Sequence, residues 1–222
     1  MEKRRIIIGD YDTAAYGWTL AAWNLSGAEQ KTNYVDKPIG DGSWDLSTAL
    51  TEDIPRYKDR QLVISLELSE GTRLERETVI RHMVNLLDGL RWSIRLPDDD
   101  FHYMIGRVRV AREYNDPAHA AVTVTATVEP WKYASAETSV VLAATTVKQT
   151  VQLWNSGRRA IVPTLKVDGT SAAVLLEYGT SSVALSAGST SWPTLLLTPG
   201  SHMLTYSGQG TLTITYREAV LE

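Results

Sequence analysis

The chain has 222 residues, a formal net charge of −4 and no cysteine. This length predicts one or two domains, each large enough to bury a core without cross-links. The absence of cysteine excludes disulfides and Cys-ligated zinc or iron–sulfur sites, and it fits assembly in a reducing cytosol. No apolar run approaches the roughly 20 residues of a membrane-spanning helix, and residues 6–8 are too short a run for a secretory leader.

Charge is distributed unevenly along the chain. Residues 136–222 carry five basic and five acidic side chains, so the whole net charge lies in residues 1–135. A mildly acidic chain without a basic stripe is poorly suited to gripping nucleic-acid phosphates. The last 87 residues are crowded with Ser, Thr, Val and Leu, a composition that favours strands. We therefore predict a mainly β protein with two domains, residues 1–135 and 136–222.

The first domain is predicted to be β-rich. Its strands are expected at residues 6–8, 17–23, 32–36, 61–68, 92–96, 103–112 and 121–128. The clearest is 61–68, where Leu62, Ile64, Leu66 and Leu68 alternate with more polar residues. The last two strands flank a turn at residues 115–117 and are expected to form a hairpin.

One helix is expected between these strands. Thr72 and Glu75 have the spacing of a capping box, in which each side chain satisfies a backbone N–H group of the other residue. Behind them, apolar residues recur at spacings of three and four, namely Ile80, Met83, Val84, Leu87 and Leu90. This pattern predicts an amphipathic helix over residues 73–90, closed near Gly89.

The second domain is predicted to contain strands alone. They are expected at residues 147–154, 164–167, 173–178, 183–185, 194–197, 202–206 and 211–217. Turn signals such as Asp168-Gly169 and Gly208-Gln209-Gly210 separate them at regular intervals. Short strands with such spacing predict an antiparallel β-sandwich.

No catalytic or metal-binding constellation is evident. The acidic run Asp98-Asp99-Asp100 precedes His102, but it lacks the spacing of a calcium loop and predicts a solvated turn. A second acidic group comprises Asp36, Asp41, Asp45, Glu52 and Asp53. A pair of carboxylates could support glycoside hydrolysis, but turn formation accounts better for these Asp and Gly residues. We predict no enzyme activity, no cofactor and no metal.

Five short motifs follow one another along the chain. They are Lys31–Asp36 with Gly40–Ser47, Arg56–Arg60, Leu96–Val108, Glu129–Tyr133 and Thr215–Glu218. In this order they resemble the distal tail protein family of long-tailed phages that infect Gram-positive hosts. Ala219 is a departure, because the family often has Gly there.

This resemblance implies a structural subunit of a phage or phage-like tail tip. Residues 1–135 would form a hexameric hub ring, and residues 136–222 would form a galectin-like sandwich with no room for an inserted carbohydrate-binding module. The implied partners are further copies of the chain, possibly in stacked rings, a tail tube protein and a tail-tip protein. DNA would only pass through the lumen. Assembly would occur in the host cytoplasm, with no membrane involved.

Aromatic residues supply the candidate contacts. The chain has seven Trp and ten Tyr but one Phe, and Trp, Tyr and Arg are favoured at interfaces. We predict ring contacts around Trp44, Arg56 and Tyr57, although packing inside the protomer would explain them equally well. The alternative function is a carbohydrate-binding adhesin whose sugar platform would use Trp154, Tyr178 or Trp192.

Overall fold

The computed structural model describes residues 4–51, 53–97 and 99–222. The chain divides into two compact units, unit 1 (Met1–Lys132) and unit 2 (Tyr133–Glu222). The division falls three residues before the boundary predicted from composition. The predicted mainly β class is confirmed, since strands dominate both units and α1 (Arg73–Leu87) is the one α-helix among the described ranges.

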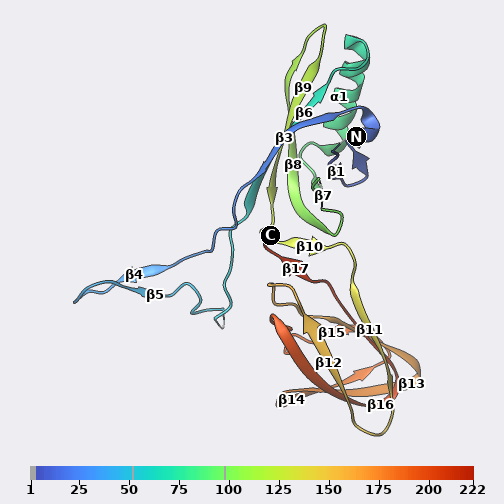
Figure 1. The fold of residues 1–222 in the computed structure, drawn as a ribbon. Coiled ribbons are helices and arrows are strands. Elements are labelled where there is room, and N and C mark those ends of the chain that lie inside the picture. The colour runs from blue at the N-terminus through green and yellow to red at the C-terminus, as the bar shows by residue number, and fades with distance from the viewer. Residues whose placement is uncertain (1–3, 52, 98) are drawn as a thin grey trace. The chain divides into compact units, whose positions relative to one another are not determined.

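Unit 1 is built on an antiparallel sheet with the strand order β2-β1-β7-β8-β9-β6-β3. The strands are β1 (Ile7–Ile8), β2 (Tyr11–Asp12), β3 (Thr19–Leu25), β6 (Arg60–Leu68), β7 (Arg91–Arg95), β8 (His102–Asn115) and β9 (Ala120–Val128). A short 3₁₀ helix, η1 (Ala14–Tyr16), precedes β3. Two further strands, β4 (Tyr34–Asp36) and β5 (Ser43–Asp45), form a separate pair on the loop between β3 and β6 (Figure 1).

One face of this sheet is covered and the other is bare. Along β6, alternate residues from Leu62 to Leu68 are buried, as their spacing predicts, and they share a core with Ile80, Met83 and Leu87 of α1. The intervening residues of β6, β9 and β8 point to the opposite face. They include the exposed side chains of Gln61, Thr127 and Arg109. We call this second surface the bare face.

The helix begins as predicted and ends earlier than predicted. The backbone N–H of Glu75 donates to Thr72 Oγ1 (3.3 Å), and the N–H of Thr72 donates to Glu75 Oε2 (2.7 Å), which completes the capping box. The prediction of a helix to residue 90 is wrong, because α1 ends at Leu87. Gly89 adopts φ +74°, and its N–H donates to Val108 O in β8 (2.8 Å), which turns the chain toward the sheet.

A buried arginine locks the start of α1 against the β8–β9 turn. Arg76 is fully buried, and its guanidinium donates to the carbonyl oxygens of Gly71 (2.6 Å), Asp116 (2.7 Å) and Pro117 (3.0 Å). Burying a charge is costly unless the charged group is hydrogen-bonded, and these three carbonyls offset the cost of burying the Arg76 guanidinium. Arg76 therefore fixes the helix to a turn about 40 residues later in the chain.

Unit 2 is an antiparallel sheet with the order β11-β16-β13-β14, in which β12 also pairs with β16 and β15 with β13. The strands are β11 (Thr138–Ala144), β12 (Gln149–Asn155), β13 (Thr164–Tyr178), β14 (Ser181–Ser186), β15 (Gly188–Ser191) and β16 (Gly200–Tyr216). Strand β10 (Lys132–Ala134) pairs with β17 (Ala219–Val220). The core of unit 2 is formed by inward residues such as Leu165, Leu176, Leu204 and Ile214.

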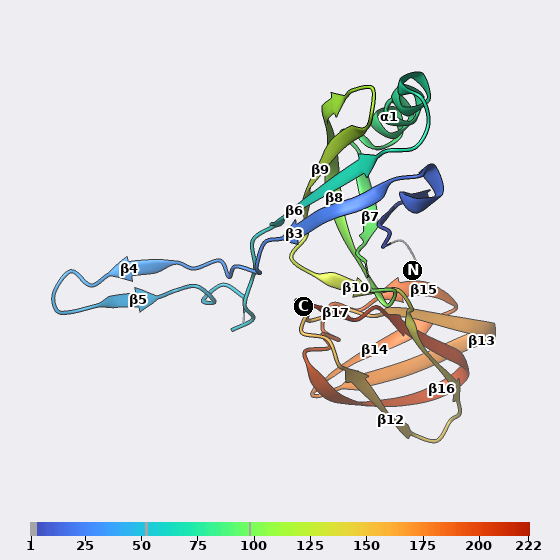
Figure 2. The ribbon, with the colours of Figure 1, turned by 45° about the horizontal axis from the view of Figure 1, so that its top comes forward.

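Two long strands replace four predicted short ones. The predicted turn at residues 208–210 is wrong, because β16 continues through it and pairs first with β12 and then with β11. Gly208 and Gly210 have φ values of +131° and +123°, so the strand bends without stopping. The predicted turn at Asp168-Gly169 lies at a register shift within β13. Both strands thus run through the two halves of one sheet, which curves around the core of unit 2 (Figure 2).

Two smaller expectations for unit 2 also fail. Residues 138–144, which were assigned to no strand, form β11 and pair with the second half of β16. Residues 194–197, which were predicted to be a strand, form turns and a single bridge between Leu197 and Ile161. Leu195 and Leu197 are nevertheless buried. Their apolar character reflects core packing rather than strand pairing.

We expect Thr72→Ala to lower the free energy of unfolding of unit 1 by about 0.5–2 kcal/mol, because it removes the N-cap acceptor of α1. Urea denaturation followed by circular dichroism would measure the loss. Thr78→Ala is the matched control, since Thr78 is an exposed threonine within the same helix and Ala is the better helix former. Equal destabilisation by both substitutions would contradict the assigned role of Thr72.

Candidate subunit interface

The loop between β3 and β6 forms an extended arm, which we define as residues 26–59. Its strands β4 and β5 pair from Tyr34–Asp45 to Asp36–Ser43 and form a sheet of their own. Figures 1 and 2 show this pair projecting away from the sheet of unit 1. Every residue from Glu29 to Leu46 is exposed.

The arm exposes large apolar side chains. Ile39 and Leu50 are 94% and 99% exposed, Tyr34 is 61% exposed and Trp44 is 50% exposed. A lone two-stranded hairpin is marginally stable in water, and a group of exposed apolar residues marks an interaction surface. The arm has the composition of a segment that a partner covers.

The root of the arm is firmly held. Arg60 is buried, and its Nε donates to Ser26 O (2.6 Å), while Ser26 N donates to Gln61 O (2.9 Å). Further out, the two legs pair antiparallel: the N–H of Lys58 donates to Glu29 O (2.8 Å), and Lys58 Nζ lies 2.6 Å from Glu29 Oε1. These contacts hold the legs together and direct the arm outward.

The three predicted ring contacts lie on this arm, in different environments. Trp44 is on β5 opposite Val35, and its side chain is exposed. Arg56 is also exposed, and its carbonyl accepts from Lys31 N (2.8 Å). Tyr57 is half-buried and packs edge-on against Trp131, with ring centroids 5.4 Å apart. Tyr57 therefore packs within the protomer. The assignment of all three residues to ring contacts stays a prediction.

The acidic residues of the arm are dispersed along it. Asp36 accepts from Ser43 Oγ (2.8 Å), and Asp45 accepts from Ser47 N (2.9 Å). The hydrogen bonds from Ser47 hold the pKa of Asp45 below its ordinary value. Asp53 has φ +60° and accepts from Thr48 Oγ1 (3.3 Å), whereas Glu52 lies outside the described residues. These local bonds support turns, and they bring no two carboxylates together.

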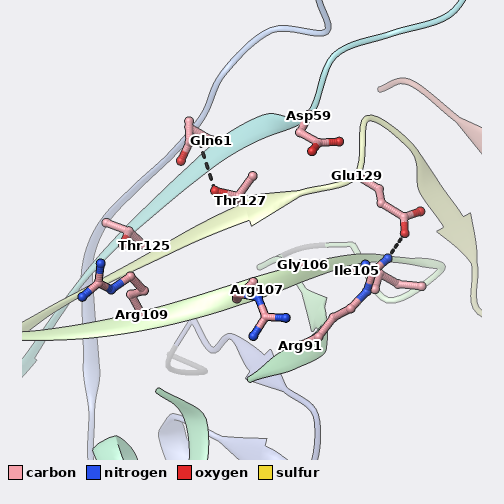
Figure 3. Close-up of a pocket in the computed structure, with 10 residues that line it drawn as sticks. All are labelled: Asp59, Gln61, Arg91, Ile105, Gly106, Arg107, Arg109, Thr125, Thr127 and Glu129. Atoms are coloured by element: carbon pink, nitrogen blue, oxygen red, sulfur yellow. Dashed lines mark hydrogen bonds and ion pairs between the residues drawn. The ribbon is translucent and has the colours of Figure 1, made fainter. Parts of the chain in front are cut away.

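A shallow cavity of about 520 Å³ lies on the bare face, near the root of the arm. It is lined by Asp59, Gln61, Arg91, Ile105, Gly106, Arg107, Arg109, Thr125, Thr127 and Glu129. Figure 3 shows these residues on β6, β9, β8 and β7, with Asp59 just before β6 and Glu129 just after β9. Gln61 Nε2 donates to Thr127 Oγ1 (3.2 Å), and Arg91 is paired with Glu129. We call this hollow the sheet cavity.

The acidic turn after β7 is held by a specific ion pair. Asp99 is half-buried, Asp99 Oδ1 accepts from His102 N (3.1 Å) and lies 2.9 Å from His102 Nδ1, and Asp99 Oδ2 lies 3.4 Å from Lys132 Nζ. Burial disfavours its ionised form, but His102 and Lys132 outweigh burial and hold the pKa of Asp99 below its ordinary value. The prediction of a merely solvated turn is thus wrong for Asp99. Asp98 lies outside the described residues.

The three residues of the alternative sugar platform differ in exposure. Trp154 on β12 is 57% exposed. The hydroxyl of Tyr178 lies 2.7 Å from Nδ1 of His202, whose side chain is buried. Trp192 is half-buried against the core of unit 2. Trp154 is thus largely exposed, whereas Tyr178 and Trp192 are engaged in packing.

Other kinds of site find little support in the described ranges. No group of three His, Asp or Glu side chains there could hold a metal ion. In the same residues, no helix has the length and apolar character needed to cross a membrane. The surface that carries the most unusual features is the arm, together with the sheet cavity at its root.

Sequence reasoning missed most of this surface. Ile39 and Leu50 do not belong to a helical or strand-like repeat of apolar residues. The sequence pattern therefore did not mark them as candidate interface residues. The sheet cavity draws on four strands, and its lining becomes apparent once strand register is known. A usable signal was present in the arm: apolar residues scattered through a segment otherwise dominated by Gly, Ser and Asp.

Comparison with known proteins identifies the fold. No family model matches the sequence, and no curated protein matches it. Among solved structures, the chain is similar to the SPP1 Dit (gp 19.1) protein, described as a paradigm of the hub adsorption apparatus in phages that infect Gram-positive bacteria. The TM-score is 0.68 at 16% identity, and the match covers 96% of this chain and 98% of that one. The fold expected from the five motifs is therefore confirmed.

We expect Trp44→Ala to leave the stability of the protomer within about 0.5 kcal/mol of its original value, because the side chain lies outside both cores. The same change should weaken self-association at least about tenfold if Trp44 anchors a subunit contact. Sedimentation equilibrium would measure the second effect and urea denaturation the first. Phe101→Ala is the control, since Phe101 is 80% exposed and lies outside the arm. Equal weakening by both substitutions would contradict a specific role for Trp44.

The Asp99 ion pairs predict a pH dependence of stability. A carboxyl with a lowered pKa stabilises the folded state above the unfolded pKa of about 3.9, and this contribution is lost as the pH falls through the folded pKa. We therefore expect Asp99→Asn to destabilise unit 1 at pH 7 and to have a smaller effect as the pH falls toward 2. Asp10→Asn is the control, since Asp10 is exposed. A loss from Asp99→Asn that is equal at both pH values would overturn the ion-pair explanation.

Proposed function

We propose that this protein is a noncatalytic structural subunit of the tail tip of a phage or phage-like particle. It would close a six-membered ring that joins the tail tube to tail-tip proteins and continues the DNA channel. The observation that carries the proposal is the likeness in fold to SPP1 Dit over nearly the full length of both chains. A fold alone does not define a function, so the surface must supply independent support.

The arm supplies that support. Its exposed apolar residues need a partner, and the part of the chain that carries them has no core of its own. Closed rings are built from heterologous contacts, in which one surface of a subunit meets a different surface of its neighbour. An arm that projects from one side of a rigid sheet is suited to such a contact.

The neighbours in the proposed assembly would be a tail tube protein and a tail-tip protein. Assembly would take place in the host cytoplasm, and the finished ring would lie at the tip of the virion tail. DNA would cross the ring without being held by it.

Light scattering on a sizing column would test ring formation. Six protomers of 24.6 kDa would have a mass of about 148 kDa, and two stacked rings would have about 295 kDa. We expect one of these masses at high protein concentration, with annular particles in electron micrographs. A mass of 24.6 kDa at every concentration, with no rings in micrographs, would contradict unaided ring closure. Glycan binding that quenches Trp fluorescence would then favour the adhesin alternative.

A further inference from the structure

We infer that the sheet cavity is a binding site for a phosphate group. The site consists of two residue pairs that face each other across β8 and β9, Arg107 with Thr127 and Arg109 with Thr125. It lies within one protomer, so the inference does not depend on ring formation. It is carried by the clustering of arginines, by the position of the carboxylates and by the hydroxyl groups beside the guanidinium groups.

Three arginines of like charge lie next to one another in the sheet cavity. Arg91 on β7 is directly opposite Arg107 on β8, and Arg109 follows two residues later on the same face of β8. Like charges that face each other across an antiparallel pair are destabilising. Glu129 pairs with Arg91, and Arg107 donates to the carbonyl of Gly89. Neither Arg107 nor Arg109 forms an ion pair with a carboxylate among the described residues. The repulsion between the arginines opposes folding, and a bound anion would relieve it.

The two carboxylates of the sheet cavity lie at one end of it. Asp59 immediately precedes β6 and Glu129 immediately follows β9, and the two strands pair up to this point, so the carboxylates are level with each other. Arg109 is opposite Thr125, four residues before Glu129, which amounts to roughly 14 Å along an extended strand. Exposed charges at that separation are largely screened from each other at physiological ionic strength. The end of the cavity that contains Arg109 is therefore positive (Figure 3).

The net charge of the chain does not oppose anion binding at this end. Residues 34–53 of the arm contain five acidic residues and one basic residue, so they account for the whole net charge of −4. The remainder of the chain, which includes the sheet cavity, is neutral overall.

The hydrogen-bond donors of the site suit a tetrahedral oxyanion better than a carboxylate. Gln61 Nε2 donates to Thr127 Oγ1 (3.2 Å), so the hydroxyl of Thr127 can donate its own proton to a ligand. Residues directly opposite each other in a sheet have Cβ atoms about 5 Å apart, so a guanidinium and the facing threonine hydroxyl can reach the same anion. One guanidinium satisfies both oxygens of a carboxylate. A phosphate has more oxygens and more charge, and it can use the donors of Arg107 and Arg109 together.

The size and lining of the sheet cavity restrict the ligand further. Its volume of about 520 Å³ is within the usual range of ligand sites, so it has room for an organic group attached to the phosphate. None of its ten described lining residues is aromatic, so it lacks a surface on which a nucleobase could stack. We therefore expect recognition of the phosphate and not of a base. The two sources of such a group are a small phosphorylated compound and the backbone of DNA.

Titration of the full-length protein with inorganic phosphate, followed by phosphorus NMR of the ligand, would test the site. We expect saturable binding that weakens as sodium chloride is added. Arg109→Gln should weaken it at least about fivefold, because it removes donors to a charged ligand. Arg81→Gln is the matched control, since Arg81 is an exposed arginine on α1, outside the sheet cavity. No saturable binding, or equal weakening by both substitutions, would overturn the site.

Thermal unfolding provides a second readout, which a purely structural role of Arg109 would not give. In phosphate-free buffer, Arg109→Gln should maintain or raise the midpoint of unfolding, because it removes one of three like charges. Phosphate should raise the midpoint of the original protein, since a ligand that binds the folded state stabilises it. The same phosphate concentration should raise the midpoint of the variant less. A variant that is less stable without phosphate and equally stabilised by it would contradict the assigned role of Arg109.

Two further probes distinguish the sources of the phosphate. Binding of thymidine monophosphate but not of a short thymidine oligonucleotide would support the site and identify a small phosphorylated compound as its ligand. Binding of the oligonucleotide that inorganic phosphate displaces, and that Arg109→Gln weakens, would support the site and identify the DNA backbone. One salt-sensitive phosphate contact in each protomer is compatible with DNA that slides past it. Annular particles without phosphate binding would overturn this site and leave the proposed function intact.

Discussion

The two-residue alternation of β6 is the constraint on which unit 1 depends. Leu62, Ile64 and Leu66 must all face α1, and a shift of one residue would expose every one of them. The same alternation places Gln61 and Val63 on the bare face. Because β6 pairs with β9 along its whole length, its register also sets which threonines of β9 join them. The covered core and the open surface are thus two results of one strand register.

The parts of the fold that could be predicted are those governed by local rules. The capping box at Thr72 and Glu75 and the alternation in β6 depend on residues close in sequence, and both are present. The continuity of β13 and β16 was not predictable in this way. Glycines such as Gly208 permit a turn or a bend equally well, and the choice is made by neighbouring strands. The end of α1 was misplaced because Leu90 continues the apolar period, although it lies beyond the helix.

The candidate interface could be predicted only where residue type alone was informative. Interface residue types drew attention to Trp44, Arg56 and Tyr57, and all three lie on the arm. Whether a side chain is exposed, however, depends on whether other parts of the fold pack against it. A local sequence pattern does not contain that information. The packing of Tyr57 against Trp131 joins residues 74 positions apart, and the sheet cavity joins four strands.

Several residues of the five motifs have structural roles that explain their chemistry. A side chain at Gly106 would place its Cβ 2.5 Å from Val128 Cγ1, so β8 and β9 approach closely there. Lys132 pairs with Asp99, and Tyr216 donates its hydroxyl proton to Trp154 O (2.8 Å). Arg217 reaches the carbonyl of Ser135 (2.9 Å). These close approaches and hydrogen bonds give the motif residues structural roles within this chain.

The position of the arm between β3 and β6 has a mechanical consequence. Both legs continue directly into strands, so tension on the arm acts along the axes of β3 and β6. Hydrogen bonds between antiparallel strands lie perpendicular to the strands, and β6 pairs with β9 over nine consecutive residues. A pull on the arm therefore loads this ladder in shear, where all its bonds resist together, rather than opening it one bond at a time. The arm is therefore attached where a pull acts along a nine-residue ladder.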